Sequence, residues 1–271
     1  MKNYLKIFYF LFFFLTGPIA LANDLDKGNR LFNSGQYKEA MSFLMKTDTQ
    51  TDPRAMNLIG YMYDSGLGVE KNPEKALQWY QKAAEKGLPA AQFNLGLMYQ
   101  YGEVVTKSQT EAVKWFRKAA EQNYTDAEMK MGYLTVKGIG TKKDYVESMK
   151  WYRKAAEHGE KEAYGYIGLF YAKGYGVKKD LNHAVQYYIL GAQKGDAKSQ
   201  VLLANAYGKA KGIKYDPEKA LYWYIKSAKN GSIEAMKELG YIYETGRLGV
   251  TKNLQEAQRW NEMAKKASEK Q

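Results

Sequence analysis

Tryptophan recurs along this chain at an interval of 36 residues, and this period constrains the fold more than any other feature. All five tryptophans lie on it, a tyrosine takes the fourth place, and one inserted residue lengthens the last interval to 37. A series of small residues precedes the aromatic series by 19 or 20 positions. The aromatic series is Trp79, Trp115, Trp151, Tyr187, Trp223 and Trp260, and the small one is Gly60, Gly96, Gly132, Gly168, Ala204 and Gly240. We therefore expect six copies of one structural unit.

Each copy is expected to form two antiparallel helices, A and B. In the first copy, Ala55, Ile59 and Tyr63 share one helical face, and Gly66 supplies the left-handed residue that closes helix A. Helix B then begins after a residue whose side chain accepts hydrogen bonds from the first-turn N–H groups. These caps recur at one phase, as Asn72, Ser108, Asp144, Asp180, Asp216 and Asn253.

Helix B is expected to bury its small and aromatic residues together. In the first copy these are Ala76, Trp79, Tyr80 and Ala83, a mixture that allows close helix approach while the rings fill the remaining space. A lysine follows each tryptophan at the same helix position in four copies, and we interpret these lysines as a solvated outer face. They are Lys82, Lys118, Lys154 and Lys226.

Residues 76–87 (ALQWYQKAAEKG) and their copies at 112–123, 148–159 and 220–231 resemble the Sel-one-like repeat of the tetratricopeptide superfamily. The resemblance implies an all-α, right-handed α-solenoid. Residues 26–46 look like a divergent tetratricopeptide hairpin, which extends the expected N-terminal cap to 23–51. The expected repeats are 52–89, 90–125, 126–161, 162–197, 198–233 and 234–267, followed by a polar tail at 268–271.

The first 22 residues have the pattern of a secretory signal peptide. Lys2 and Lys6 precede an apolar run at 7–15, and Ala20 and Ala22 offer a cleavage site. The alternative is an uncleaved membrane anchor, but a bilayer span needs about 20 apolar residues. We expect cleavage after Ala22 and a periplasmic or secreted protein.

Composition argues against most catalytic chemistry. The chain has no cysteine and two histidines, which excludes thiol nucleophiles and Cys-ligated zinc and leaves little for histidine chemistry. Its 41 basic against 29 acidic residues give a net charge of +12. For an exported protein this charge favours acidic proteins, anionic lipids or anionic wall polymers over nucleic acid.

No chemical motif stands out. The glycine pairs near the ends of the A helices lie between two helices rather than after a strand, so they predict turns and not phosphate loops. His158 and His183 lack metal-ligand spacing, and Asp64 and Glu244 are isolated carboxylates in different repeats. We expect no catalytic residue, metal or cofactor.

A binding surface can be placed by helix phase. Helix A lines the concave side of two-helix solenoids, so its residues outside the packing face are expected to meet a partner. Those after the recurrent small residue are Tyr61, Leu97, Tyr133, Leu169, Asn205 and Tyr241. Four residues later, Lys137, Lys173 and Lys209 form what we call the lysine ladder. The other interpretation is that the helix dipole alone favours these lysines at the end of helix A.

The predicted function is non-catalytic protein binding. Exported bacterial proteins of the family that resemble this chain include periplasmic immunity proteins that neutralise phospholipase toxins of type VI secretion. An acidic toxin face would complement the lysine ladder. The alternatives are an envelope or host-interaction adaptor, and a hydrolase or binder of cell-wall fragments.

Overall fold

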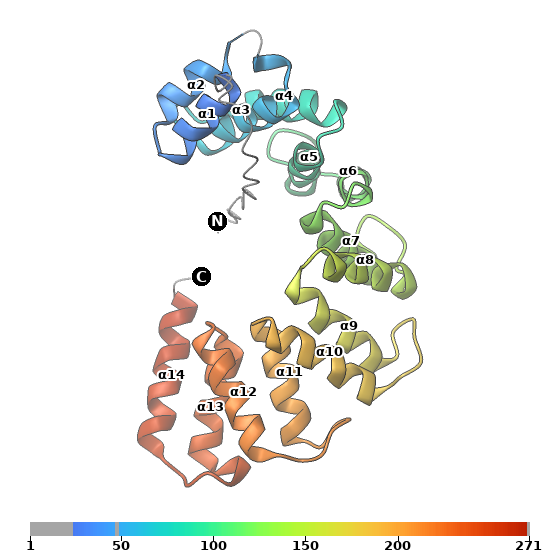
Figure 1. The fold of residues 1–271 in the computed structure, drawn as a ribbon, viewed down its shortest axis with the longest axis vertical. Coiled ribbons are helices and arrows are strands. Elements are labelled where there is room, and N and C mark those ends of the chain that lie inside the picture. The colour runs from blue at the N-terminus through green and yellow to red at the C-terminus, as the bar shows by residue number, and fades with distance from the viewer. Residues whose placement is uncertain (1–23, 47–48, 270–271) are drawn as a thin grey trace, which may run out of the picture. The chain divides into compact units, whose positions relative to one another are not determined.

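The computed structural model describes residues 24–46 and 49–269, and every regular element in these ranges is helical (Figure 1). The predicted signal peptide, 1–22, lies outside the described residues, as do the last two residues of the predicted tail. None of the described helices combines the length and the apolar character that crossing a membrane requires.

The helices follow one another as hairpins. An N-terminal hairpin consists of α1 (Asp24–Asn33) and α2 (Tyr37–Leu44), followed by a 3-10 turn, η1 (Thr49–Thr51). The A helices are α3 (Pro53–Ser65), α5 (Pro89–Tyr101), α7 (Thr125–Lys137), α9 (Lys161–Lys173), α11 (Ala197–Gly208) and α13 (Ile233–Thr245). The B helices are α4 (Pro73–Glu85), α6 (Gln109–Glu121), α8 (Tyr145–Glu157), α10 (Leu181–Gln193), α12 (Pro217–Lys229) and α14 (Leu254–Glu269), with η2 (Arg247–Gly249) before α14.

Each A helix packs on the B helix of its own repeat, and the hairpins form two compact units, residues 1–124 and 125–271. The first unit holds the N-terminal hairpin and repeats one and two, and the second holds repeats three to six. Within each unit, helix B also packs on helix A of the next repeat. This arrangement confirms the predicted all-α solenoid of six repeats with an N-terminal hairpin.

In repeats one to four, a glycine of helix A packs directly against an aromatic ring of helix B. A Cβ on Gly132 would lie 2.8 Å from Cε1 of Tyr152, so only a hydrogen leaves room for that ring. Tyr152 is 1% exposed, and burial raises the pKa of its hydroxyl well above the usual range. The same contact pairs Gly60 with Tyr80, Gly96 with Phe116 and Gly168 with Tyr188. The recurrent small residue is therefore a packing requirement between the two helices of one repeat.

All six predicted caps are confirmed. In every repeat the side chain of the cap residue accepts a hydrogen bond from the backbone N–H three residues later, at 2.8–3.2 Å. Five of the A helices end as predicted where glycine adopts a left-handed conformation, as at Gly66 with φ of 70°, whereas α11 is followed by Lys209 with φ of −125° and Ala210 with φ of 51°. Local sequence therefore sets where helix A ends and where helix B begins within a hairpin.

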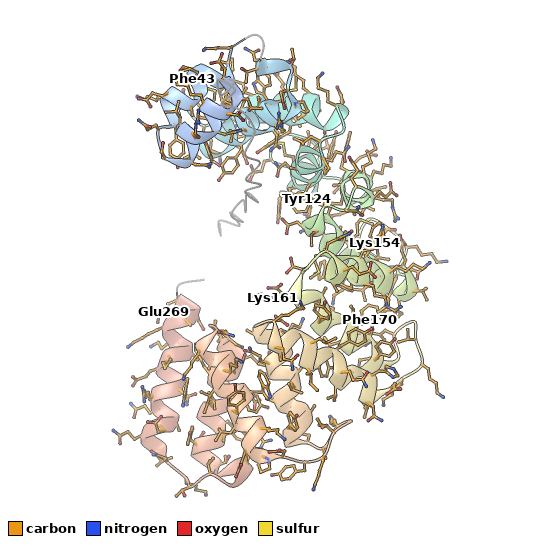
Figure 2. All side chains as sticks on the ribbon, in the orientation of Figure 1. Phe43, Tyr124, Lys154, Lys161, Phe170 and Glu269 are labelled. Atoms are coloured by element: carbon orange, nitrogen blue, oxygen red, sulfur yellow. The ribbon has the colours of Figure 1, made fainter. Side chains whose placement is uncertain are left out.

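Four of the five tryptophans are less buried than expected, and Trp151 is 8% exposed. Trp79 is half-buried, and the neighbouring Tyr80, 2% exposed, fills the hairpin core. In four repeats the lysine three residues after the tryptophan lies over its indole, so the prediction of a merely solvated lysine face was incomplete. The distances from Nζ to the ring centroid are 4.7 Å for Lys82, 4.0 Å for Lys118, 5.2 Å for Lys154 (Figure 2) and 4.9 Å for Lys226.

The seated ring makes a testable contribution to stability. We expect Tyr152→Ala to lower the free energy of unfolding by about 3–5 kcal/mol, because it empties a buried aromatic site. The exposed Tyr241 provides the control, since Tyr241→Ala should cost less than about 0.5 kcal/mol. Urea denaturation followed by circular dichroism measures both, and equal losses would contradict a core role for the ring.

The aspartate caps predict acid sensitivity. The pKa values of Asp180 and Asp216 lie below their ordinary 3.8, chiefly because the backbone N–H groups of His183 and Lys219 bind the carboxylates. A lowered folded-state pKa gives stability that is present above about pH 4 and is lost as the pH falls through the folded value. The urea midpoint of the native protein should therefore fall toward that of the Asp180→Asn, Asp216→Asn double variant between pH 5 and pH 3. A difference in urea midpoint between the two proteins that does not change with pH would contradict this prediction. The control is Asn72→Ser, which exchanges one neutral cap for another.

Candidate functional site: the face of the A helices

Two A helices of the second unit contact each other directly. Besides packing on its own B helix, α9 contacts α11, so two A helices of successive repeats approach each other directly. Stacked hairpins curve toward the helices that approach most closely. We therefore examine the exposed face of α7, α9, α11 and α13 as the candidate binding surface.

The predicted groove residues divide into packed and exposed groups. In the first unit, Tyr61 and Leu97 are half-buried, and the Tyr61 ring lies edge-on to Phe32 of the N-terminal hairpin, with centroids 6.0 Å apart. In the second unit Leu169 is half-buried, whereas Tyr133 and Tyr241 are 44% and 49% exposed. The exposed aromatic residues at this phase thus belong to the second unit.

The lysine ladder is exposed, and one member is held in place. Lys137, Lys173 and Lys209 all lie at the surface, at or just after the C-terminal ends of α7, α9 and α11. Nζ of Lys209 donates to Oδ1 of Asn205 at 2.9 Å, so two predicted residues of the site meet in one repeat. Arg247 lies over the Tyr241 ring at 5.2 Å and adds a cation beside the groove position of the last repeat.

Sequence reasoning missed an aromatic stack on the same face. The Tyr166 ring of α9 lies parallel to the buried Tyr152 ring of α8, with centroids 4.6 Å apart and planes 4° apart. Lys198 of α11 places Nζ 3.8 Å from the Tyr166 centroid. These three residues come from α8, α9 and α11, which belong to three successive repeats. Only their phase within the repeat, two and six residues before the recurrent small residue, could have indicated them.

Charge changes sign along the A helices. Carboxylates occupy the first turn of three of them, at Asp126, Glu162 and Glu234, and the lysine ladder occupies the opposite ends. The helix dipole favours this distribution. The resulting face has an acidic margin, aromatic residues in the middle and a basic margin, which suits a polypeptide segment carrying charges of both signs.

The two histidines have separate carboxylate partners. Nδ1 of His158 lies 2.9 Å from Oε2 of the fully buried Glu128, and Nδ1 of His183 lies 2.7 Å from Oδ2 of Asp180. Within the described residues no cluster of three metal-ligating side chains occurs.

The Glu128–His158 pair is one of a set that we call clasps. In each, a residue near the start of helix A meets the residue that ends helix B, 30 positions later. The others are Gln92–Gln122 at 2.8 Å, Tyr164–Lys194 with a cation–ring distance of 5.7 Å, and Gln200–Asn230 at 3.1 Å. The position of His158 is therefore explained by packing within its repeat.

The sequence predicted that Asp64 is an isolated carboxylate, but the structure places another carboxylate near it. Asp64 is half-buried on α3, and its pKa is raised by burial and by the nearby Glu103 of the next repeat. The nearby Lys71 opposes this shift of the Asp64 pKa.

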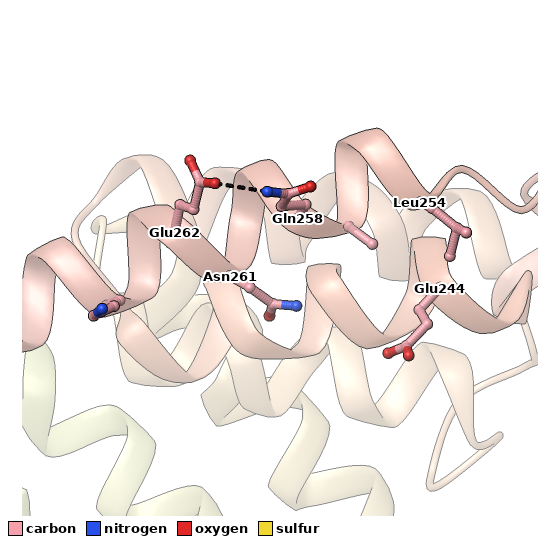
Figure 3. Close-up of a pocket in the computed structure, with 7 residues that line it drawn as sticks. Glu244, Leu254, Gln258, Asn261 and Glu262 are labelled. Carbon is pink, nitrogen blue, oxygen red and sulfur yellow. Dashed lines mark hydrogen bonds between the residues drawn. The ribbon is translucent and has the colours of Figure 1, made fainter.

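A polar hollow of about 410 Å³ lies on the last repeat (Figure 3). Asn261 stands where the other repeats carry the seated ring, and its Oδ1 occupies the space next to Gly240. In repeat five, helix α12 packs toward α13 with apolar residues: Leu221, Ile225 and Ala228. At the equivalent positions of α14, the lining of the hollow has polar residues: Gln258, Glu262 and Lys265. The hollow thus marks a polar outer face on α14, in place of the apolar face that receives a further hairpin.

The Sel1 repeat sequence model matches the chain six times, at residues 53–88, 89–124, 125–160, 161–196, 197–232 and 233–268. The chain belongs to the Sel1-repeat family. The match and the helical pairing together make this chain a Sel1-repeat protein-binding scaffold.

Solved structures agree with this assignment. A Sel1 repeat protein from Oxalobacter formigenes is 59% identical, over 90% of this chain and 97% of that one, with a TM-score of 0.86. A protective antigen of uropathogenic Escherichia coli strains is 35% identical with a TM-score of 0.78; the match covers 90% of this chain and 53% of the antigen. An immunity protein of Pseudomonas aeruginosa shares the fold at 17% identity, a TM-score of 0.53, and coverage of 93% and 88%. No curated protein matches the sequence.

The buried carboxylate of the third-repeat clasp provides a test. His158→Ala should lower the free energy of unfolding by about 1–3 kcal/mol, because Glu128 loses its partner away from water. Asn230→Ala removes the equivalent residue from a neutral clasp and should cost about 1 kcal/mol or less. Urea titrations at pH 7 compare the two, and a smaller loss for His158→Ala would contradict the clasp.

Proposed function

We propose that this Sel1-repeat protein is a non-catalytic binding scaffold of the cell envelope, and that it is an immunity protein against a secreted phospholipase toxin of type VI secretion. The proposed location is the periplasm, reached through the N-terminal segment. The observation that carries the binding role is the A-helix face of the second unit, where exposed Tyr133 lies on α7 between Asp126 and Lys137, and exposed Tyr241 lies on α13, which has Glu234 in its first turn. Aromatic anchors surrounded by charge are typical of protein interfaces.

The immunity role is supported by two considerations. An immunity protein of Pseudomonas aeruginosa is built on the same fold over nearly the whole length of this chain. An inhibitor also needs a preformed surface that binds without reorganising, and repeats whose hairpins are locked by seated rings provide one. The partner is expected to present an acidic segment to the lysine ladder.

A second candidate is supported by the greater similarity to the uropathogenic Escherichia coli protein, which is described as a protective antigen. An antigen is reached by the host immune system, so this similarity favours a protein exposed at or beyond the cell surface. In that case the same face would bind a host or envelope protein.

Capture of partners distinguishes these functions. The purified protein is used to retrieve binding proteins from envelope extract, and any retrieved lipase is then produced in the periplasm of a test cell with and without this protein. A stoichiometric lipase whose toxicity disappears on co-production supports immunity. Retrieval of envelope-assembly or host proteins without a lipase favours the adaptor, and turnover of wall fragments by the protein alone would contradict the non-catalytic assignment.

The lysine ladder has a specific test. The triple change of Lys137, Lys173 and Lys209 to Glu should weaken binding of the retrieved partner about tenfold or more and reduce its sensitivity to salt, because attraction becomes repulsion. The matched control changes Lys150, Lys229 and Lys266 to Glu; these exposed lysines lie on B helices and alter net charge equally. Titration calorimetry at 0.05 and 0.3 M salt measures the affinity of each variant for the partner. Equal affinities of the ladder variant and the control variant would contradict a binding role for the lysine ladder.

A further inference from the structure

The loops that join helix A to helix B are basic in the second unit only. Residues 138–143, 174–179, 210–215 and 246–252 each contain two cations and no carboxylate. In the first unit, residues 66–71 and 102–107 each pair one lysine with one glutamate. The cations of the four basic loops are Lys142, Lys143, Lys178, Lys179, Lys211, Lys214, Arg247 and Lys252. We call these four loops the basic edge.

The loops of the basic edge are neighbours in space. Each of two loops rests on the start of helix B of the preceding repeat, through a glycine that leaves no room for a side chain. A Cβ on Gly176 would lie 2.9 Å from the backbone nitrogen of Val146, and one on Gly212 would collide with the Leu181 carbonyl. The rings of Tyr145 and Tyr175 stack at 4.6 Å across the first of these junctions. In the last repeat, η2 packs against α12 of repeat five. The cations therefore lie along one continuous margin of the unit.

Most of this charge is not neutralised within the protein. Lys142, Lys178, Lys179, Lys211 and Lys214 are exposed, and none of them forms an ion pair with another described residue. The aspartates that follow three of the loops are the helix caps, whose carboxylates bind backbone N–H groups of the B helices. Arg247 is the exception, since it lies 4.0 Å from Glu238.

Exposed apolar and aromatic residues lie on the same margin. Tyr175 and Tyr215 are loop residues, 38% and 51% exposed, and Val146 and Leu254, 50% and 71% exposed, begin α8 and α14. Tyrosine rings favour the boundary between water and lipid, and short apolar side chains insert between headgroups. Lysines near an anionic leaflet are attracted to its phosphates over a Debye length.

We propose that the basic edge is a membrane-docking surface that binds an anionic phospholipid bilayer. The cations are spaced over four adjacent loops, which suits a bilayer surface because phosphates are present all over it. The exposed tyrosines, Val146 and Leu254 would contact the boundary between the headgroups and the lipid tails. A protein partner is instead usually bound by a few residues near the centre of an interface, which is the arrangement proposed for the A-helix face. The docking proposal rests on loop residues rather than on the A-helix face, so it goes beyond the proposed function and does not depend on it.

Vesicle flotation tests the proposal with the purified protein as the producing cell processes it. The probes are vesicles of phosphatidylglycerol and phosphatidylcholine in equal parts, vesicles of phosphatidylcholine alone, and soluble poly-glutamate as a protein-like polyanion. The edge variant carries Lys142→Glu, Lys178→Glu and Lys214→Glu and retains the lysine ladder. The control variant is again Lys150→Glu, Lys229→Glu and Lys266→Glu, with the same net charge.

We expect the native and control proteins to float with the anionic vesicles at 0.1 M salt and to be released at 0.5 M. The edge variant should show about a tenfold or greater loss of bound fraction. Circular dichroism confirms that each variant is folded. Equal flotation of the edge and control variants would overturn the proposal, as would absence of binding to anionic vesicles. Binding of poly-glutamate without vesicle binding would overturn it in favour of an acidic protein. A failed ladder test with intact flotation would contradict only the proposed function.

Discussion

The contact between a glycine of helix A and a ring of helix B is the constraint on which the rest of the structure depends. It sets the distance between the two helices of a repeat, because a methyl group at Gly132 would meet the Tyr152 ring at 2.8 Å. Because that distance is set, the A helix of the next repeat packs on the other side of the B helix. The exposed residues of successive A helices therefore occupy equivalent positions. Repeat five replaces the glycine with Ala204, and repeat six replaces the ring with Asn261, where the polar hollow forms.

Regular stacking separates the surface into regions with different chemistry. The A-helix face carries aromatic residues between an acidic and a basic margin, whereas the connecting loops of the second unit carry unpaired lysines. Helix dipoles account for the signs at the helix ends but not for the loops, which lie outside the helices. The difference in loop charge between the two units therefore reflects sequence choices that the fold leaves open, and such choices are where binding specificity resides.

The histidines and the buried tyrosines make contacts that hold the hairpins together. The histidines are held by carboxylates within their own repeats, and the buried tyrosine hydroxyls are kept protonated by desolvation, with the pKa of Tyr188 raised to about 12. These contacts rigidify the hairpins and leave the exposed faces to interact with other molecules. A rigid scaffold of this kind binds by shape and charge that exist before the partner arrives.

The sequence by itself determined the repeat, the helical pairs, all six caps and the family, because periodicity and capping are local properties written in neighbouring residues. It placed Tyr133 and Tyr241 outside the packing face, where the structure finds them exposed, but it did not indicate that Tyr61 packs on Phe32 or that four of the tryptophans lie under lysines. Tertiary structure alone decided the clasps, the Tyr152–Tyr166–Lys198 stack and the continuity of the basic edge. These features join residues 14 to 46 positions apart on different helices, and their meeting depends on the distance and rotation between hairpins, which only packing sets.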